Sequence, residues 1–384
     1  MDNLFDVIVM GGGVVGLAAA LAMAQRQYSV ALIDAGTFDI DDSQPDLRVY
    51  AINQASQTLL QQLGAWQVLD KKRLSPYQHM HVWDGVTNAA IDFDSRMIAS
   101  SELGTIIEES QLRKALLQKL ADYPKVQRFP GQRITQLDSK NTPIKMASEH
   151  LCWQGRLLIA ADGKGSPARD LLQCKLTTWS YHQQALVARV QTEKPHEKTA
   201  WQIFNADGPL AFLPLADVNQ CSIVWSTSVR KAGDLMAMPE EEFNTQLTQA
   251  FASRLGEVKV LSTRHQFPLQ MRHTQDYVGA NWLLMGDAAH TIHPLAGLGL
   301  NVGLADLRTL LQLMDQQPNQ LTSKRVLQAY QRQRKHAVWQ TIAMMDSLKW
   351  LFANPLLPFA RKCGLKICNS LPFIKRLFIE QAAK

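Results

Sequence analysis

A glycine-rich turn near the amino terminus places the strongest constraint on how this chain folds. Residues 5–10 form an apolar run typical of a buried strand, and residues 17–24 are good helix formers. Between them, Gly11, Gly13 and Gly16 have the spacing of a strand–turn–helix unit that binds dinucleotides. Gly11 permits the turn, Gly13 lets the backbone approach a pyrophosphate, and Gly16 lets the helix pack against the strand. The spacing predicts an α/β fold with an anion-binding helix N-terminus.

An acidic residue at the end of the second predicted strand supports this interpretation. Residues 30–33 are apolar, and Asp34 follows them, 18 residues after Gly16. A carboxylate at this place accepts hydrogen bonds from both ribose hydroxyls, which favours FAD or NAD over NADP. The apolar stretch 5–24 is not interpreted as a signal peptide or a membrane span. No basic region precedes it, Asp2 and Asp6 carry the wrong charge, and four glycines weaken a spanning helix.

A second glycine loop lies 270 residues after Gly16 and also follows a strand-like segment, residues 282–285. It begins with Gly286 and Asp287, and residues 297–301 read Gly-Leu-Gly-Leu-Asn. One such loop alone carries little information. The two loops together describe one flavin that is held at both ends of its ribityl-pyrophosphate chain. This pair predicts a flavin enzyme.

Length and composition agree with a two-domain globular protein. The chain has 384 residues, of which 46% are hydrophobic and 19% are charged, so a disordered protein is excluded. The five cysteines are scattered, and none has the spacing typical of a metal site. We therefore expect no metal, reduced thiols and a cytoplasmic location.

The net charge of +6 is concentrated toward the carboxyl terminus. Residues 324–384 contain 12 Lys or Arg and 2 acidic residues, so this segment carries +10 and the rest of the chain −4. Two interpretations stay open. The segment makes a peripheral contact, with the anionic inner membrane face or with partner proteins, or its helices only expose lysines to water. Nucleic acid is excluded as a partner, because no nucleic-acid-binding signature accompanies the charge. The basic segment also contains Trp339, Trp350, Phe352, Phe359, Phe373 and Phe378.

The order of predicted elements indicates discontinuous domains. A helix is expected from about residue 54 to residue 69, strand-like segments dominate residues 185–267, and α/β character returns at residue 282. We predict an α/β fold (α+β overall) with three parts. They are a Rossmann-like FAD-binding domain at 1–75, 100–180 and 265–345, an inserted mainly antiparallel β-sheet substrate domain at 76–99 and 181–264, and a basic C-terminal helical tail at 346–384.

Three motifs stand in order along the chain: the glycine turn, then Asp162-Gly163, then Gly286-Asp287. This series resembles the single-component flavoprotein aromatic hydroxylases, the family of para-hydroxybenzoate hydroxylase. The ubiquinone-biosynthesis branch, the 2-polyprenylphenol hydroxylases, is more similar still, and the resemblance covers nearly the whole chain. It is carried by residues 47–53, 211–215, 221–226 and 286–303. The resemblance implies an FAD-dependent aromatic-ring monooxygenase.

The resemblance also implies roles for individual residues. The glycine turn holds the FAD pyrophosphate, Asp34 the adenosine ribose, and Asp287 the ribityl and ribose hydroxyls. Asp162 and Gly163 serve both FAD and NAD(P)H, while residues 297–301 begin a helix whose N-terminus stabilises negative charge on the reduced flavin. The implied cofactor-binding set is Gly11, Gly13, Gly16, Asp34, Arg48, Arg113, Asp162, Gly163, Gly286, Asp287, Gly297, Gly299, Leu300 and Asn301.

The implied reaction hydroxylates a polyprenylated phenol on the way to ubiquinone. NAD(P)H reduces FAD, and O₂ then forms a flavin C4a-hydroperoxide that transfers one oxygen to the ring. Pro294 and His290 are the candidate catalytic residues, the first through its backbone carbonyl and the second because imidazole titrates near neutrality. An alternative for His290 is a hydrogen bond within the loop. Strands at 201–204 and 211–215 are expected to form an apolar floor for the substrate.

One residue departs from the pattern of the branch, which usually has Gln where this chain has Leu298. Either one hydrogen bond to flavin or substrate is missing, or only the backbone N–H groups of the loop matter. Other FAD enzymes of the same fold, a halogenase or an isoprenoid-chain reductase, stay as alternatives, although the Trp-x-Trp-x-Ile signature expected of a halogenase is absent. A further alternative is a non-catalytic flavoprotein subunit of a biosynthetic assembly. Hydroxylation at ring carbon C5 is preferred over C6.

Overall fold

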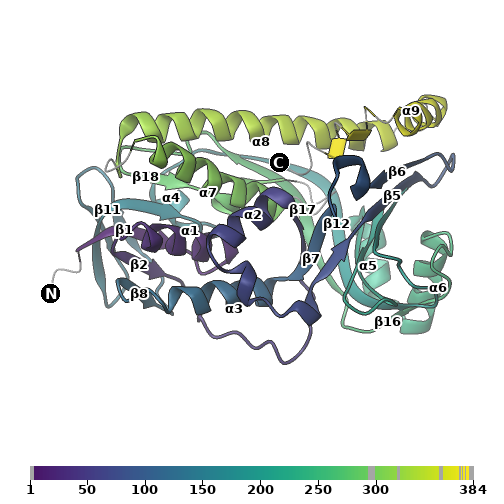
Figure 1. Ribbon diagram of the computed structural model, residues 1–384, viewed down its shortest axis with the longest axis horizontal. Helices are drawn as coiled ribbons and strands as arrows, with labels where there is room; N and C mark the ends of the chain where they lie inside the picture. Colours follow the sequence, from purple (N-terminus) through teal and green to yellow (C-terminus); the bar gives the residue numbers. More distant parts are fainter. Residues whose placement is uncertain are drawn as a thin grey trace.

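The molecule is elongated, with an α/β part near the amino terminus and a curved sheet at the opposite end (Figure 1). A long helix runs beside both parts. The predicted fold class, an α/β fold (α+β overall) with a Rossmann-like part, an inserted mainly antiparallel sheet and C-terminal helices, is confirmed. The computed structural model describes residues 4–292, 299–317, 321–353 and 358–371, and residues 373, 375, 376, 378 and 379.

The first sheet has seven strands and contains the glycine turn at the end of one of them. In spatial order the strands are β8 (Val126–Phe129), β2 (Val30–Ile33), β1 (Leu4–Met10), β11 (Cys152–Ala160), β10 (Ile144–Ala147) and β9 (Gln136–Asp138), with β18 (Trp282–Leu284) beside β11. The strands β8, β2, β1, β11 and β18 are parallel to one another, whereas β10 pairs antiparallel with both β11 and β9. Because the carboxyl ends of parallel strands meet at one edge, both glycine loops leave the sheet at the same edge.

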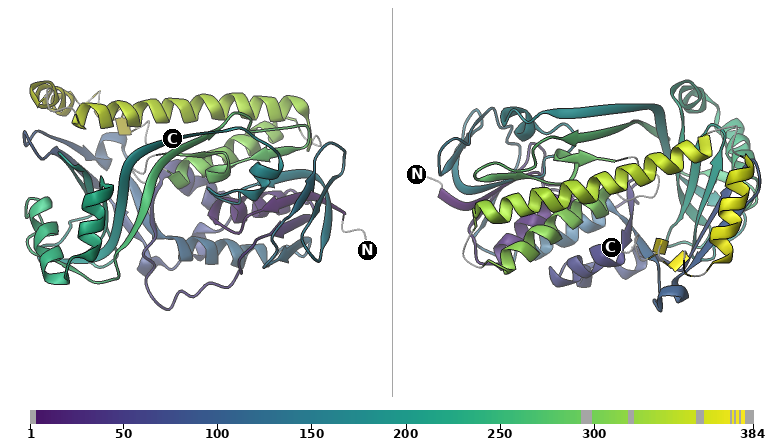
Figure 2. Two further views of the ribbon diagram at one scale, coloured as in Figure 1. Left: turned by 180° about the vertical axis from the view of Figure 1, so that it is seen from behind. Right: turned by 90° about the horizontal axis from the view of Figure 1, so that it is seen from above.

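Helices cover the faces of this sheet. The first, α1 (Val14–Gln25), is buried along nearly its whole length, which suits its run of small alanine side chains. It contacts α3 (Glu109–Leu120) and α7 (Gly299–Asp315), and α7 in turn packs against α8 (Lys324–Ala353). Figure 2 shows α8 passing from the first sheet to the second, where α9 (Pro358–Ser370) follows it.

The second sheet has nine strands, nearly all antiparallel. Its main path is β19 (His290–Thr291), β17 (His265–Thr274), β12 (Leu176–Thr192), β15 (Gln220–Ser228), β14 (Gly208–Pro214), β13 (Thr199–Asn205), β5 (His79–Asp84) and β6 (Ala90–Asp94), with β16 (Val258–Val260) also on β12. One face packs against α5 (Val229–Ala237) and α6 (Glu240–Ala250). The opposite face is directed toward the α/β part.

A small antiparallel sheet connects the two parts of the molecule. It consists of β3 (Val49–Asn53), β7 (Gly104–Glu108) and β4 (Ser75–Tyr77). Side chains of this sheet, including Ala51 and Ile106, form a common apolar cluster with Ala200 and Leu213 of the large sheet. This contact fixes the distance between the glycine loops and the large sheet.

The structure differs from the sequence-based expectation in several elements. The helix expected to reach residue 69 is shorter, because α2 (Gln54–Gln62) ends before Gly64, whose φ of +75° cannot continue an α-helix. The strands β8, β9 and β10 and the helix α5 were not predicted. The boundary predicted at residue 181 falls within β12, so the domain limits stay a prediction.

Candidate functional site

The glycine turn after β1 has the close contacts that its sequence predicts. Gly11 adopts a φ of +112°, and a Cβ atom there would lie 2.2 Å from the carbonyl oxygen of Ala161. A Cβ atom on Gly16 would lie 2.0 Å from the carbonyl oxygen of Gly11. Both positions therefore require glycine, because the backbone of the turn is wedged between α1 and the end of β11.

Gly13 is a glycine of a different kind. It is the N-cap of α1, with φ −76° and ψ 175°, and no side chain caps the helix. A Cβ atom at Gly13 would meet nothing within 4 Å. The start of α1 therefore has no side-chain cap and has open space beside Gly13, and an uncapped helix N-terminus favours a phosphate there. The residues of this turn fit the pyrophosphate of FAD.

Asp34 and Arg113 hold the shape of this turn. The Asp34 carboxylate accepts hydrogen bonds from the backbone N–H of Gly12 and, at 2.7 Å, from that of Gly36. The Arg113 guanidinium donates to the carbonyl of Gly12 at 3.1 Å. Both predicted residues therefore lie beside the glycine turn. Each Asp34 oxygen keeps a second lone pair with which a ribose hydroxyl could bond.

Arg48 and Asp287 lie far apart in the sequence but near each other in the structure. The Arg48 side chain is 63% exposed, and its Nε lies 3.0 Å from a carboxylate oxygen of Glu109. Burial raises the pKa of Asp287 above its usual value, while the charges of His290 and Arg48 oppose this rise. The predicted FAD-tail arginine and the aspartate of the second loop thus lie close enough to influence each other electrostatically.

Asp162 is used by the protein itself. Its carboxylate accepts hydrogen bonds from the Ser166 hydroxyl at 2.5 Å and from the backbone N–H of Ala168 at 2.9 Å, so it stabilises the start of α4 (Pro167–Leu171). Burial raises the pKa of Asp162, and the Ser166 hydrogen bond opposes this rise. The adjacent Gly163 has a φ of +86°, which suits glycine. Its predicted contact with FAD or NAD(P)H stays a prediction.

The buried Arg169 connects the Asp162-Gly163 loop to the second glycine loop. Its guanidinium donates to the carbonyl of Ala288 at 3.2 Å and to that of Lys164 at 3.1 Å. The carbonyl of Lys164 also accepts a hydrogen bond from Arg272 at 2.8 Å. Arg169 therefore connects two loops that lie more than a hundred residues apart in the sequence, and Arg272 connects the first of them to β17.

A buried ionic cluster lies beneath the second glycine loop. The Asp306 carboxylate, fully buried on α7, lies 2.7 Å from His290 Nε2 and 2.6 Å from Arg334 Nε, and accepts the Gly286 N–H at 2.8 Å. Burial alone would raise the pKa of Asp306, but His290, Arg334 and the hydrogen bonds outweigh burial and lower it. His290 is 2% exposed and faces this cluster. His290 thus bonds to Asp306 of α7 and not within the loop as expected, and its catalytic role stays a prediction.

The N-terminus of α7 is attached to the small sheet. The Asn301 amide donates to the carbonyl of Ala51 at 2.7 Å and accepts from the N–H of Asn53 at 3.1 Å. The side chain of Leu300 belongs to the main core. Gly299 has open space where a Cβ would be. For Asn301 and Leu300, a contact with flavin would therefore use the backbone. The predicted residues Pro294, Gly297 and Leu298 lie outside the described residues.

Sequence reasoning missed the role of Asp306, Arg334 and Arg169. A signal for Asp306 was available, because an aspartate on the apolar face of a helix must be paired when it is buried. Its partners could not be identified, since Arg334 lies on another helix and His290 on a strand of the other sheet.

The inner face of the large sheet is the face toward the small sheet. The role expected for its strands 201–204 and 211–215, as an apolar floor for the substrate, stays a prediction. Side chains alternate along these strands, so Phe212 packs against α5 and α6 whereas Ala211 and Leu213 point the other way. The inward-facing Leu213, Val224 and Val187 are only half-buried. This face offers apolar surface that the described side chains do not fully cover.

Comparisons with known proteins agree with this geometry. Residues 5–345 match the model of the FAD binding domain family. The chain is 35% identical to 3-demethoxyubiquinol 3-hydroxylase of Escherichia coli, covering 98% of both chains. It is 31% identical to ubiquinone hydroxylase UbiL of Rhodospirillum rubrum, covering 99% of this chain and 90% of that protein. It is also 31% identical to the mitochondrial ubiquinone biosynthesis monooxygenase COQ6 of Danio rerio, covering 100% and 90%.

Solved structures show the same fold at low sequence identity. The p-nitrophenol 4-monooxygenase PnpA of Pseudomonas putida superposes with a TM-score of 0.82 at 15% identity, covering 100% of this chain and 99% of that one. Pseudomonas aeruginosa PqsL, in complex with 2-aminobenzoylacetate, gives 0.77 at 18% identity, covering 95% and 100%. The resemblance drawn from the motifs is thus confirmed. This chain belongs to the FAD-dependent monooxygenases, in the group of the ubiquinone-biosynthesis hydroxylases.

Proposed function

We propose that this chain uses O₂ and NAD(P)H to hydroxylate the ring of a polyprenylated phenol in ubiquinone biosynthesis, at C5 in preference to C6. The observation that carries the proposal is the near-complete alignment with relatives named for hydroxylation in this pathway. The open helix N-terminus at Gly13 and the half-buried apolar floor support it, because one suits a dinucleotide phosphate and the other a hydrophobic substrate.

Each part of the site has a task in this proposal. Bound FAD supplies the redox chemistry and the activation of oxygen. The N-termini of α1 and α7 and the Arg48 guanidinium stabilise negative charge on the cofactor. The large sheet positions the substrate ring and excludes water from it. The Asp306 cluster holds the Gly286 N–H and His290 in fixed positions, so the second glycine loop keeps its shape.

Product analysis under ¹⁸O₂ tests the reaction. The purified full-length chain is loaded with FAD and given NAD(P)H and a short-chain prenylphenol. We expect one ¹⁸O atom in a new ring hydroxyl, and the position of that hydroxyl decides between C5 and C6. Turnover without label would favour a reductase or halogenase of this fold. Bound FAD without any NAD(P)H oxidation would favour a non-catalytic subunit.

We also propose peripheral membrane contact through the carboxyl-terminal helices. None of the helices in the described ranges is long and apolar enough to cross a bilayer. Large apolar side chains are nevertheless exposed on α8, on α9 and just beyond: Trp350 (63%), Ile367 (55%), Leu371 (45%), Phe373 (70%) and Phe378 (46%). Exposed basic side chains at Lys362 and Arg376 lie among them. Apolar and basic groups on one segment suit an anionic lipid surface.

Vesicle sedimentation tests this contact against a protein-docking role. Lys362→Glu combined with Phe373→Ser should release the chain from phosphatidylglycerol vesicles, with FAD content unchanged. Lys324→Glu is the matched control. Lys324 is exposed at the first residue of α8, and the 30 residues of this helix place its two ends about 45 Å apart. Lys375 is unsuitable, since it is buried and bonds to Asn369. Equal sedimentation of the double variant and the wild type would contradict membrane contact.

A further inference from the structure

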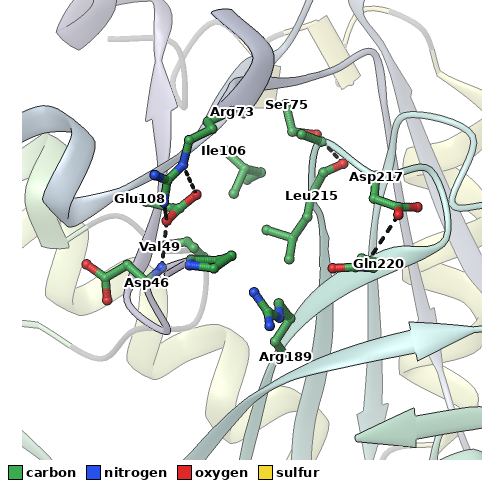
Figure 3. Close-up of a pocket in the computed structure, with 12 residues that line it drawn as sticks. Asp46, Val49, Arg73, Ser75, Ile106, Glu108, Arg189, Leu215, Asp217 and Gln220 are labelled. Carbon is green, nitrogen blue, oxygen red and sulfur yellow. Dashed lines mark hydrogen bonds and ion pairs between the residues drawn. The ribbon is translucent and has the colours of Figure 1, made fainter. Parts of the chain in front are cut away.

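A cavity of about 140 Å³ lies between the small sheet and the large sheet (Figure 3). Its apolar walls include Val49 and Ile106 on one side and Leu215 on the other. The Ser75 hydroxyl donates to the carbonyl of Leu215 at 3.0 Å and holds the two sheets together beside the cavity. A cavity of about 150 Å³ with apolar walls accommodates one benzene ring. The space therefore suits a monocyclic aromatic group.

The acidic side chains that line the cavity already have donors. Glu108 forms an ion pair with Arg73 and accepts the backbone N–H of Asp46 at 2.6 Å. The Asp46 carboxylate accepts two backbone N–H groups, at 2.9 Å and 3.1 Å. Asp217 accepts from the Asn219 N–H and from the Gln220 amide. Glu108 is thus paired with a cation, whereas Asp46 and Asp217 keep their charge but have their oxygens engaged by N–H donors.

Arg189 differs from these residues. It lies on β12, and because side chains alternate along a strand it faces the cavity whereas Ala188 and Val190 belong to the core on the other face. Figure 3 shows its guanidinium directed into the space between Val49, Leu215 and Gln220. Its Nε is buried without a hydrogen-bond partner, and among the described residues no carboxylate forms an ion pair with Arg189.

We propose that this cavity binds a monocyclic aromatic anion, whose acidic group is held by the Arg189 guanidinium. A buried guanidinium N–H without a partner is costly, and a carboxylate or phenolate satisfies it with a charge-assisted hydrogen bond. Val49, Ile106 and Leu215 would pack against the ring. The natural ligand, but not the site, rests on the proposed function: it would be the ionised phenol ring of the substrate.

Calorimetric titration of the full-length FAD-loaded protein tests the site. Benzoate and benzamide have nearly the same shape but differ in charge. We expect benzoate to bind at least ten times more tightly than benzamide, Arg189→Gln to abolish this preference, and Arg189→Lys to keep part of it. The control is Arg254→Gln, on the other face of the sheet, where Arg254 lies 5.1 Å from the Trp201 ring centre. It should bind benzoate like the wild type.

Two results would overturn the site: equal binding of benzoate by Arg189→Gln and wild type, or no preference over benzamide. FAD content and ¹⁸O incorporation are measured on the same preparations. A wild type that prefers benzoate through Arg189 but never hydroxylates a phenol would contradict the proposed function and leave the site intact. A protein that hydroxylates a phenol but binds benzoate and benzamide equally would support the proposed function and contradict the site.

Discussion

The two faces of the large sheet are built from the same strands but have opposite characters. On the face toward α5 and α6, Phe212 and Trp225 are fully buried against side chains such as Phe243 of α6. The Phe212 ring stacks on Phe251 with 3.7 Å between centroids. On the face toward the α/β part, Val224 and Leu213 are half-buried. One face is closed and supplies stability, while the apolar side chains of the other face are less completely covered. Alternation along a strand allows one sequence to do both.

The largest expected effect is on the closed face. Phe212→Ala removes a fully buried ring and leaves a cavity, so the free energy of unfolding should fall by about 3–5 kcal/mol. Val224→Ala, on the next strand but on the open face, should cost about 1 kcal/mol, because little packing is lost. Urea denaturation of both variants measures the difference. Similar losses would show that the open face is packed as tightly as the closed one.

The buried ionic cluster of Asp306, His290 and Arg334 is a part of the molecule where stability should depend on charge. Asp306→Asn leaves the buried Arg334 guanidinium without its counter-charge, and we expect a loss of about 3 kcal/mol. The double change Asp306→Asn with Arg334→Met should recover part of this loss, because no unpaired charge is then buried. Urea denaturation again measures it. A double variant less stable than the single one would contradict this explanation.

A smaller effect concerns His273 on β17, beside α8. Burial, together with the charges of His290 and Lys335, lowers the pKa of His273 to about 4. The folded protein therefore keeps this imidazole neutral, whereas the unfolded chain binds a proton near its ordinary value of 6.5. Stability should decrease as the pH falls from 6.5 toward 4, by on the order of 2–3 kcal/mol, because a difference of one pKa unit is worth about 1.4 kcal/mol. In His273→Asn, thermal unfolding should show a flatter pH profile over this range. An unchanged profile would assign the pH dependence to other groups.

The sequence sufficed to predict the elements whose signals are local. The strand–turn–helix unit around Gly11 and Gly16 was found because glycine spacing, apolar run and helix formers are neighbours in the chain. Of the large sheet, β12, β13, β14 and β15 were found through short apolar runs, whereas β16, β17 and β19 were not identified as separate strands. The same reasoning gave the wrong end for α2, which ends at Gln62, and it missed the half-exposed β8, whose sequence lacks a clear alternating pattern.

The parts of the site that the sequence could not predict depend on tertiary contacts. The pairing of Asp306 with His290 and Arg334 joins two helices and a strand. Glycine spacing also could not distinguish Gly13, which has open space beside it, from Gly16, which is in close contact with the turn. Periodicity shows which face of an element is apolar, but not which other element covers it.

The smallest expected effect on stability is at Gly13, which has open space beside it at the start of α1. Its backbone angles are allowed for alanine and a Cβ would meet nothing, so Gly13→Ala should change the free energy of unfolding of the FAD-free protein by less than about 0.5 kcal/mol. If the FAD pyrophosphate lies against α1 here, the added methyl group occupies its space, and FAD affinity should fall at least tenfold. Fluorescence titration with FAD measures this. Gly233→Ala, in α5 and also with free space around it, is the matched control and should bind FAD normally. Tight FAD binding by Gly13→Ala would mean that the space beside Gly13 is not the phosphate site, and the open space at the start of α1 would then need another explanation.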